Sequence, residues 1–571
     1  MGLVNSLKSH NLRGDIFGGL TAAIVALPLA LAFGLSSGIG AEAGLYGAIL
    51  VGFFAALFGG TPSQISGPTG PMTVVMATVF TSLSAAADSP DAALAMAFSV
   101  VMLGGIFQII FGLLRLGVYI TLMPYTVISG FMSGVGVIII LIEIGPLLGH
   151  RTSANVIDSV RDIPVFLSDI NPAAVGLGLL TLAIVFLSPP KLNRLIPSPL
   201  LALIVCTLVA VFLLPPGWEF DQIGDIPQGL PHLHLPSFDL SQWQVILGSA
   251  LMLAVLGSID SLLTSLVADN ITGTQHDSDK ELIGQGLGNL ISGLFGGLPG
   301  AGATMRTVIN VQAGGKTAIS GLVHASILLV ILLGAGPLTE QIPHAVLAGI
   351  LLKVGIDIID WSFLKRAHRV SIRATLIMYG VLLLTVFVDL ITAVVVGVFV
   401  ANLFTVKRLS DLQIKSVSTT SDPDGDIELT GEEKHLLKQA KGRILLFCLG
   451  GPMSFGAAKS ISQRMSIVEK YEVLILDLSD VPFLGVTASL AIENMLKEAK
   501  EKRREVFIVG ARTSVQDRLQ RFDILKLLPP KNRLTNRLDA LQQAIATIEH
   551  EPKILPKTSL NKQAVESNQS Q

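Results

Sequence analysis

The chain has 571 residues, of which 50% are hydrophobic and 14% are charged, and its mean hydropathy is +0.65. These values exclude a soluble globular protein and indicate that most of the chain lies in lipid. The formal net charge of −2 gives no basic surface of the kind that binds nucleic acid. Cys206 falls in an apolar span and Cys448 in the soluble part of the chain, so we expect no disulfide between them.

Apolar stretches recur between residues 16 and 403, and each is long enough to cross a hydrocarbon core of about 30 Å as a helix. Lys and Arg gather in alternate loops, and the opposite loops hold only Arg151 and Arg161. The positive-inside rule therefore predicts an even number of spans and cytoplasmic termini. The fourteen predicted spans are 15–36, 40–60, 62–82, 92–115, 121–149, 172–188, 197–214, 245–268, 280–296, 298–314, 317–335, 338–358, 374–390 and 391–408.

The composition changes after Arg408, where charged residues become frequent. "GRILLFCLGG", "YEVLILDLSD" and "VFIVGAR" are typical of buried strands, and "SLAIENMLKEAKEKRRE" is typical of an amphipathic helix. We therefore expect a small cytoplasmic α/β domain at the C-terminus. The predicted organisation is a cytoplasmic segment without a signal-peptide pattern (1–14), a transmembrane domain (15–408), a linker (409–436), the α/β domain (437–550) and a disordered tail (551–571).

Two predicted spans, the third and the tenth, are interrupted by glycine and proline. The third breaks at "GPTGP", residues 67–71, and the tenth at "GLPGAGA", residues 297–303, before a helix expected to begin near Ala303. Their separation of seven spans is that of two inverted repeats, although we find no sequence identity between the halves. Interrupted spans at matching positions indicate the central site of a transporter, where the helix N-termini would attract an anion. Glycines that only let helices pack closely are the alternative.

Asp260 lies in the middle of the eighth predicted span, "SALMLAVLGSIDSLLTSLVAD". A carboxylate at this depth costs about 2.5 to 3.5 kcal/mol on insertion scales and is a functional candidate. Thr264 is on the same helical face, and the two side chains with carbonyls of the tenth span would suit Na⁺ or H⁺. A carboxylate hydrogen-bonded for packing is the alternative. We expect Arg306 to anchor toward the inner surface rather than to balance an anion, and Glu143 to lie near water.

The run "DKELIGQGLGNLISGLFGGLPGAGATMRTVINV", with "GGLTAAIVALPLALAFGLSSG" and the α/β domain, resembles the SulP family of anion transporters over nearly the whole chain. Within that family, "GPTGPMTVV" and "SIDSLLTSLVAD" resemble the sodium-dependent bicarbonate transporters. The resemblance implies 7+7 inverted repeats forming core and gate domains, a cytoplasmic STAS domain, and a homodimer that works by an elevator-like movement of the core.

The resemblance also implies the site residues. It places Na⁺, the coupling ion and the only expected cofactor, at Asp260, Thr264, Gly302, Ala303 and Thr304. It places the anion at Thr69, Gly70, Ala303 and Thr304.

Three positions depart from the family pattern. Leu29 follows Pro28 where many members carry Gln, which disfavours a sulfate-type site. In the STAS-like unit Gly485 and Val486 stand where an Asp and a phosphorylatable hydroxyl are usual, and Thr487 is one place further on. We therefore expect a dimerising role for this unit rather than a phosphorylation switch.

The sequence and the resemblance together predict sodium-dependent bicarbonate uptake across the plasma membrane. Two alternatives keep the same site: a proton-coupled or exchanging sulfate or dicarboxylate transporter, and an anion channel. A membrane-anchored signalling protein is a third. An enzyme is not expected, because no nucleophile, base and orienting group occur together at a plausible spacing.

Overall fold

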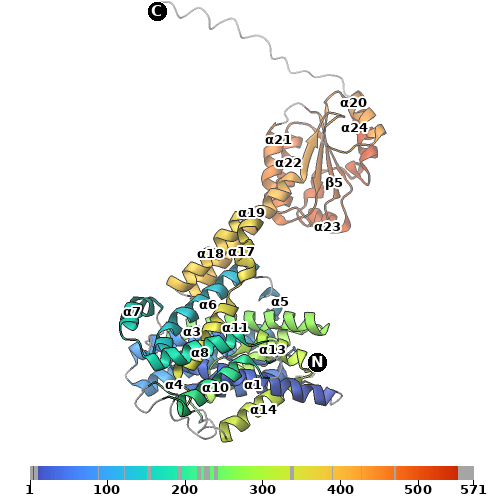
Figure 1. The fold of residues 1–571 in the computed structure, drawn as a ribbon. Helices are drawn as coiled ribbons and strands as arrows, with labels where there is room; N and C mark the ends of the chain where they lie inside the picture. Colours follow the sequence, from blue (N-terminus) through green and yellow to red (C-terminus); the bar gives the residue numbers. More distant parts are fainter. Residues whose placement is uncertain are drawn as a thin grey trace, which may run out of the picture. The chain divides into compact units, whose positions relative to one another are not determined.

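The computed structural model divides into two compact units, Met1–Ala401 and Asn402–Gln571, which are described separately (Figure 1). The structure describes residues 4–5, 11–87, 89–120, 123–150, 156–189, 192, 196–214, 220–223, 232–236, 242–334, 340–388, 390–425, 427–467 and 471–550.

The first unit is built from helices and one pair of very short strands. Its helices are α1 (Leu12–Ser36), α2 (Ala41–Phe58), α3 (Gly70–Ala86), α4 (Pro90–Leu113), α5 (Gly117–Ile120), α6 (Tyr125–Leu148), α7 (Val156–Ser168), α8 (Pro172–Leu187), α10 (Ser198–Phe212), α11 (Trp243–Thr272), α12 (Ser278–Leu294), α13 (Thr304–Gln312), α14 (Ala318–Gly334), α16 (His344–Ile358), α17 (Trp361–Val370), α18 (Ile372–Phe387) and the first part of α19 (Leu390–Lys415), whose residues after Ala401 belong to the second unit. Its strands are β1 (Ser66–Gly67) and β2 (Ala301–Gly302).

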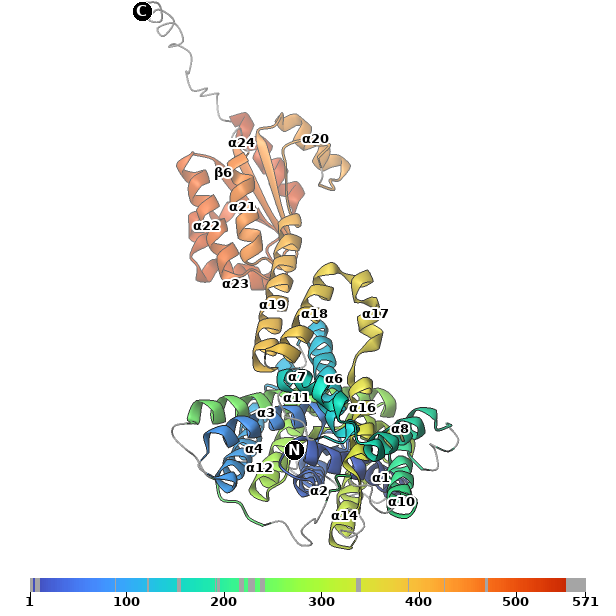
Figure 2. The same cartoon turned by 60° about the vertical axis from the view of Figure 1, so that its left-hand side comes forward.

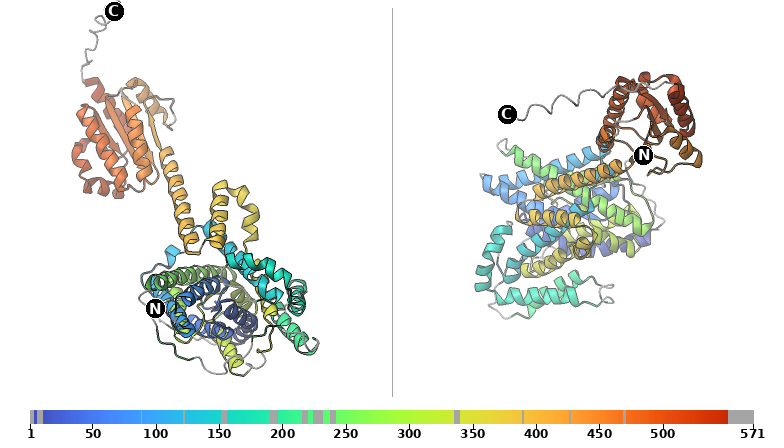
Figure 3. Two further views of the ribbon diagram at one scale, coloured as in Figure 1. Left: turned by 90° about the vertical axis from the view of Figure 1, so that its left-hand side faces the viewer. Right: turned by 90° about the horizontal axis from the view of Figure 1, so that it is seen from above.

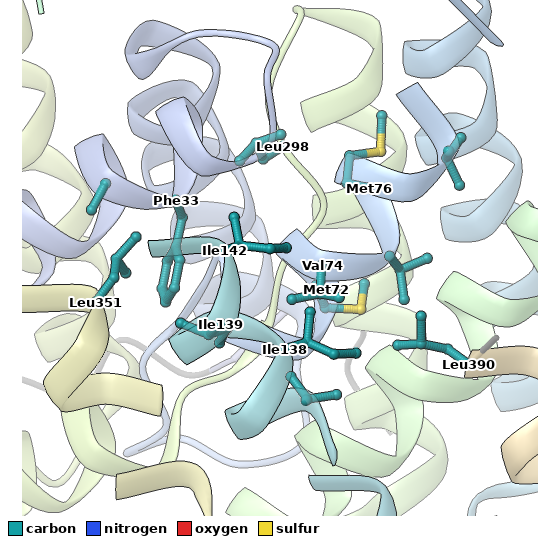
Figure 4. Close-up of a cluster of buried hydrophobic side chains, with 14 of the residues drawn as sticks. Phe33, Met72, Val74, Met76, Ile138, Ile139, Ile142, Leu298, Leu351 and Leu390 are labelled. Carbon is teal, nitrogen blue, oxygen red and sulfur yellow. The ribbon is translucent and has the colours of Figure 1, made fainter. Parts of the chain in front are cut away.

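Helices far apart in the sequence pack together in this unit. Figure 3 shows the blue N-terminal helices beside green helices from the middle of the chain, and α2 packs against both α12 and α14. Small residues permit close approach, as where α4 meets α12: a Cβ on Gly105 would lie 2.4 Å from the backbone nitrogen of Leu290. A buried apolar cluster joins α3, α6 and the segment before β2, with Met72, Ile138 and Leu298 among its members (Figure 4).

Six helices of the described chain are long and apolar enough to cross a membrane, namely α1, α2, α4, α6, α11 and α19. The pair α7 and α8 would add a seventh span, although it bends by 114° at its break. The apolar helices α3, α10, α14 and α18 are shorter. By length and hydropathy alone the structure therefore gives up to seven spans, fewer than the fourteen predicted, because several predicted spans contain short or broken helices.

The second unit is a five-stranded sheet with helices on both faces. Its elements are β3 (Val417–Thr420), α20 (Gly431–Ala440), β4 (Ile444–Gly450), α21 (Phe455–Ile467), β5 (Val473–Asp480), α22 (Val486–Glu501), β6 (Glu505–Val509), α23 (Thr513–Arg521), β7 (Arg533–Leu534) and α24 (Arg537–His550), with 3-10 turns at Ile524–Leu527 and Pro530–Asn532. The strand order follows the sequence, and only β3 and β4 pair antiparallel.

The central strands of this sheet are apolar on both faces, as expected when helices cover both sides. Leu474 and Leu476 of β5 pack in the cluster with α21 and α22, and Val473 and Ile475 pack in the cluster with α20 and α24. Figure 2 shows the two helix layers flanking the strands. The α/β architecture predicted from the alternating apolar runs is therefore confirmed.

Three segments differ from the expected organisation. The range 409–436, predicted as a linker, holds the end of α19, the edge strand β3 and most of α20, because a polar strand at a sheet edge gives no apolar signal. The helices α7 and α17 occupy segments expected to be loops. The predicted disordered tail, 551–571, and most of the N-terminal segment 1–14 lie outside the described residues.

Candidate functional site

The two interrupted spans meet at their breaks. β1 pairs antiparallel with β2, so that Ser66 is opposite Gly302 and Gly67 is opposite Ala301. The amide of Ala303 donates to the carbonyl of Ile65 at 2.8 Å and extends the pairing. This short ladder satisfies backbone groups that would otherwise be unpaired inside the membrane, and it brings the starts of α3 and α13 together.

Both half-helices begin without a side-chain cap. Thr69 and Ala303 are the N-cap residues, and neither side chain accepts a hydrogen bond from the first turn of its helix. Pro71 lies in the first turn of α3, where its missing N–H costs nothing. The first N–H groups of a helix have no partner within the helix, and the helix dipole places positive potential there. Two such ends side by side form a site for a small anion.

The helix α11 supports the second half-helix through two hydroxyl groups. Thr264 Oγ1 donates to the carbonyl of Gly302 at 2.9 Å and lies 2.7 Å from Oγ1 of Thr304. One turn earlier, Ser261 Oγ accepts from the amide of Gly302 at 3.0 Å. The hydroxyl oxygens of Thr264 and Thr304 and the carbonyl oxygen of Gly302 therefore lie close together.

Asp260 is on the same helix, one turn before Thr264. Its side chain is only 8% exposed, and its Oδ2 atom has no hydrogen-bond partner among the described residues. The hydroxyl of Thr69 is likewise buried and makes no hydrogen bond of ordinary geometry there, but it lies close enough to the Asp260 carboxylate to interact with it. Leaving a buried polar group unsatisfied costs about 1 to 3 kcal/mol, and more for a charge, so each such group requires an explanation. A bound ion would satisfy both.

The position of Arg306 differs from the expectation. The side chain was expected to anchor toward the inner surface, but it is 3% exposed, and its Nη2 donates to the carbonyl of Pro68 at 2.6 Å. It interacts electrostatically with Asp260. The guanidinium therefore lies at the meeting point of the two breaks, where it balances the buried carboxylate.

Glu281 is a buried residue of the site's scaffold that the sequence analysis did not single out. Its carboxylate accepts from the amides of Gly60 and Thr61 at 2.9 and 2.8 Å and from the side chains of Gln64 and Gln285 at 2.7 and 2.8 Å. These bonds fix the segment that leads into β1. The "DKELIGQGLGN" motif contains both Glu281 and Gln285, but their partners near residue 60 are not visible in it.

Two buried asparagines also fix the segments at the breaks. Asn289 accepts from the amide of Gly300 at 2.7 Å and donates to its carbonyl at 2.9 Å, which fixes the segment before β2. Asn310 donates to the carbonyl of Ser63 at 2.8 Å and ties α13 to the segment before β1. Asn289 of α12 therefore positions the break before α13, and Asn310 of α13 positions the break before α3.

The structure brings most of the predicted site residues together. Of the predicted sodium set, Thr264, Gly302 and Thr304 are joined by hydrogen bonds, and Ala303 is the N-cap of α13. Of the predicted anion set, Gly70 begins α3 directly after Thr69, the N-cap of α3.

Two further residues that the sequence analysis discussed, Glu143 and Leu29, lie outside this group. Glu143, expected near water, is buried in α6. Leu29 lies in α1, half-buried, and packs against the apolar cluster rather than presenting a polar group.

Hard oxygen donors dominate this arrangement. No group of three or more His, Cys, Asp or Glu side chains that could hold a metal ion occurs in the part of the chain that the structure describes. A cation at this point would instead meet carboxylate, hydroxyl and carbonyl oxygens, which suit alkali and alkaline-earth ions.

Two family models match the chain. The sulfate permease family matches residues 12–381, more than half of the sequence, and the STAS domain matches residues 435–538. The chain belongs to the sulfate permease family and carries a C-terminal STAS domain, so the resemblance found in the sequence is confirmed.

Named relatives of high identity are transporters rather than enzymes. The chain is 55% identical over 550 residues to "Bicarbonate transporter BicA" of Picosynechococcus sp., covering 96% of this chain and 97% of that protein. It is 52% identical over 561 residues to "Bicarbonate transporter BicA" of Synechocystis sp., covering 98% and 99%.

Solved structures agree with this assignment. The transmembrane domain of a cyanobacterium bicarbonate transporter BicA matches with a TM-score of 0.65 at 55% identity, covering 69% of this chain and 100% of that one. SLC26A9 matches with a TM-score of 0.79 at 20% identity, covering 94% and 91%, and supports the fold alone. The chain is therefore a helical membrane transporter of the sulfate permease family with a C-terminal STAS domain.

Proposed function

We propose that the chain carries out sodium-dependent uptake of bicarbonate. The observation that supports this proposal most strongly is the meeting of two half-helix N-termini, both without side-chain caps, beside a buried carboxylate whose Oδ2 lacks a partner in the described chain. The 52 to 55% identity to proteins named bicarbonate transporters, over nearly their full lengths, supports bicarbonate as the anion.

The anion would bind at the first turns of α3 and α13. The backbone N–H groups following Thr69 and Ala303 would donate to its oxygens, and the buried hydroxyl of Thr69 would add one further hydrogen bond. Arg306, which holds the carbonyl of Pro68, would contribute positive potential without contacting the anion. Gly70 begins the helix with no side chain to obstruct its N-terminus.

Sodium would bind beside β2, next to α11. Oδ2 of Asp260 and the hydroxyls of Thr264 and Thr304 would provide ligands, with carbonyl oxygens from Gly302 and Ala303 completing the set. Without Na⁺, the carboxylate oxygen repels the anion in a poorly screened environment. With Na⁺ the repulsion is neutralised, so the binding of the two ions is coupled.

We further propose fourteen spans arranged as 7+7 inverted repeats, with core and gate domains and an elevator-like movement of the core. The breaks before α3 and α13, which interrupt two spans seven apart in the predicted order, support the repeat. We keep the transmembrane limits 15–408, begin the STAS domain at β3 rather than at residue 437, and propose a homodimer formed through that domain and a plasma-membrane location with both termini in the cytoplasm. The cytoplasmic C-terminus is supported by the STAS match.

Uptake of radiolabelled bicarbonate by proteoliposomes containing the purified chain tests the proposal. We expect an inward Na⁺ gradient to drive uptake, a K⁺ gradient of equal size not to drive it, and excess external sulfate not to inhibit it. Uptake driven equally by a pH gradient in the absence of Na⁺ would contradict the sodium assignment. Inhibition by sulfate at equal concentration would contradict the choice of anion.

A further inference from the structure

The short helix α17 presents a row of three exposed side chains, Trp361, Lys365 and Arg369. These residues are spaced four apart, so they lie on one face of the helix, and the Cβ atoms of successive members are about 5 to 6 Å apart. The opposite face holds the half-buried Phe363 and the buried Ala367, and α17 packs against α18 (Figure 2). The row is therefore the exposed, cationic face of an amphipathic helix.

The positive charge of this row is not neutralised by the described residues. The sequence of α17, "WSFLKRAHRV", contains no acidic residue. Neither Lys365 nor Arg369 forms a salt bridge in the part of the chain that the structure describes. The acid at the start of the helix, Asp360, accepts a hydrogen bond from the amide of Phe363 at 3.0 Å and interacts electrostatically with Arg366. The two cations of the row therefore remain available to an external anion.

The row lies where the lipid-facing surface of α18 begins. This helix starts two residues after α17 ends, and on one of its faces the side chains of Ile372, Leu376 and Leu383 are 69, 67 and 53% exposed. A stripe of large exposed apolar side chains on a helix of a membrane transporter faces hydrocarbon. Lys365 and Arg369 come directly before this stripe in the chain, so the row lies close to the boundary between hydrocarbon and headgroups. Tryptophan, the first member of the row, is enriched at the same boundary.

The chemistry of the row matches the headgroup of an anionic phospholipid. The guanidinium of Arg369 can bind two phosphate oxygens through parallel N–H groups, and the ammonium of Lys365 adds further donors and a point charge. The indole of Trp361 is 48% exposed, and its Nε1 donates to the carbonyl of Ile356 at 2.8 Å. A free phosphate ion would meet only the two cations, whereas a phospholipid also covers the exposed indole with the upper part of its acyl chains.

We propose that Trp361, Lys365 and Arg369 form a binding site for an anionic phospholipid, with its phosphate between the two cations and its acyl chains against the indole. A zwitterionic phospholipid has the same phosphate but carries a cation of its own, so the site prefers the anionic lipid. On the scale known for basic residues near a charged membrane surface, each cation contributes about a fivefold preference. The site is independent of the transported anion and of its coupling to sodium.

Quenching of Trp361 fluorescence by spin-labelled lipid tests the proposal in the full chain. Trp218→Phe and Trp243→Phe leave Trp361 as the one remaining tryptophan of the three in the sequence. This parent chain is reconstituted in equal parts of phosphatidylglycerol and phosphatidylcholine. In one sample a small fraction of the first lipid carries a spin label near the headgroup end of its acyl chain, and in the other sample the second lipid carries it. The ratio of the two quenching constants reports which lipid is enriched beside the indole.

Two double variants of this parent separate the row from charge in general. Lys365→Gln with Arg369→Gln removes both cations of the row. Lys500→Gln with Arg521→Gln is the matched control, because it removes the same charge from two exposed positions of the second unit.

We expect labelled phosphatidylglycerol to quench Trp361 more strongly than labelled phosphatidylcholine, with at least about fivefold enrichment of the anionic lipid in the parent chain. The variant of the row should abolish this enrichment, and the control variant should keep it. Equal quenching by the two lipids in the parent would mean that the cations only orient the chain in the membrane, and it would overturn the proposal. Quenching by neither lipid would mean that protein covers the row, and it would overturn the proposal as well.

Two further measurements identify the source of the phosphate and keep the test independent of folding. Inorganic phosphate, added at an ionic strength matched with chloride, should leave the enrichment unchanged; its loss would show that the site takes free phosphate and would overturn the lipid assignment. Should the variant of the row not fold, the salt dependence of the parent decides. Screening by KCl should lower the enrichment, and enrichment that does not respond to salt would overturn the proposal.

Discussion

Replacing Thr264 with valine removes one hydroxyl and nearly preserves the shape of the side chain. In the structure this hydroxyl donates to the carbonyl of Gly302 at 2.9 Å and lies 2.7 Å from that of Thr304. Losing one oxygen that contacts a cation is comparable to losing a hydrogen bond to a charged group, about 1.5 to 3 kcal/mol. We therefore expect Thr264→Val to raise the half-saturating Na⁺ concentration roughly 10- to 150-fold.

The assay is initial bicarbonate uptake by proteoliposomes over a range of Na⁺ concentrations, with bicarbonate saturating. Thr264→Ser keeps the hydroxyl and is the matched control, so its half-saturating Na⁺ concentration should stay within a few-fold of the wild type. Thermal unfolding of the purified variants separates a change of affinity from a loss of folded protein. An unchanged Na⁺ dependence in folded Thr264→Val would refute the assignment of Thr264 as a sodium ligand.

Three further predictions concern buried polar groups. Arg306→Gln removes the charged donor to the carbonyl of Pro68 and the positive charge near Asp260, and should destabilise the chain by about 1.5 to 3 kcal/mol, which thermal unfolding in detergent measures; an unchanged midpoint would contradict a stabilising role for the buried guanidinium. Glu281→Gln replaces two acceptor oxygens with one and should lower both unfolding stability and uptake; normal uptake would show that the loop it holds does not position the site. Burial and then the charge of Asp477 raise the pKa of Cys448 to about 12, so its thiol stays protonated at neutral pH. Maleimide labelling of the Cys448 peptide, followed by mass spectrometry, should be slow at pH 7 and rise about tenfold per pH unit, while unfolded chain labels readily; rapid labelling of native chain would contradict this.

The parts of the site that the sequence predicts are those with a local signal. Glycine and proline interrupt an apolar run where the helix stops, so the starts of α3 and α13 could be placed, and the predicted start near Ala303 is confirmed because α13 begins at Thr304. A carboxylate within an apolar span is equally visible, which singled out Asp260. Thr264 followed from helical periodicity.

The parts that the sequence does not predict depend on contacts between distant segments. Glu281 holds Gly60 and Thr61, which are more than 200 residues away, and nothing near any of the three encodes that contact. Arg306 was expected toward the inner surface because the loop that follows its span is cytoplasmic in the predicted topology, but its acceptor, the carbonyl of Pro68, belongs to the other interrupted span. Because this acceptor is far away in the sequence, the neighbours of Arg306 in the chain do not reveal that its side chain is buried.

In the fold, too, the elements with a local sequence signal were predicted and the others were not. Alternating apolar runs are sufficient to predict the sheet of the C-terminal unit, whereas its edge strand β3 is short and polar and looks like a linker. The helices α7 and α17 are short and partly polar, so no apolar run marks them. In the membrane unit, hydropathy locates the apolar segments but does not separate long helices from short ones such as α13.

The most direct test of the account counts both ions at once. Proteoliposomes containing the wild-type chain or Asp260→Asn are loaded without Na⁺, and the entry of radiolabelled Na⁺ and radiolabelled bicarbonate is followed together after Na⁺ is added outside. We predict that the wild type takes up both ions in a fixed ratio and that folded Asp260→Asn loses the Na⁺-driven uptake of both. Wild-type bicarbonate uptake by Asp260→Asn in a Na⁺ gradient would contradict the claim that Asp260 couples the two ions.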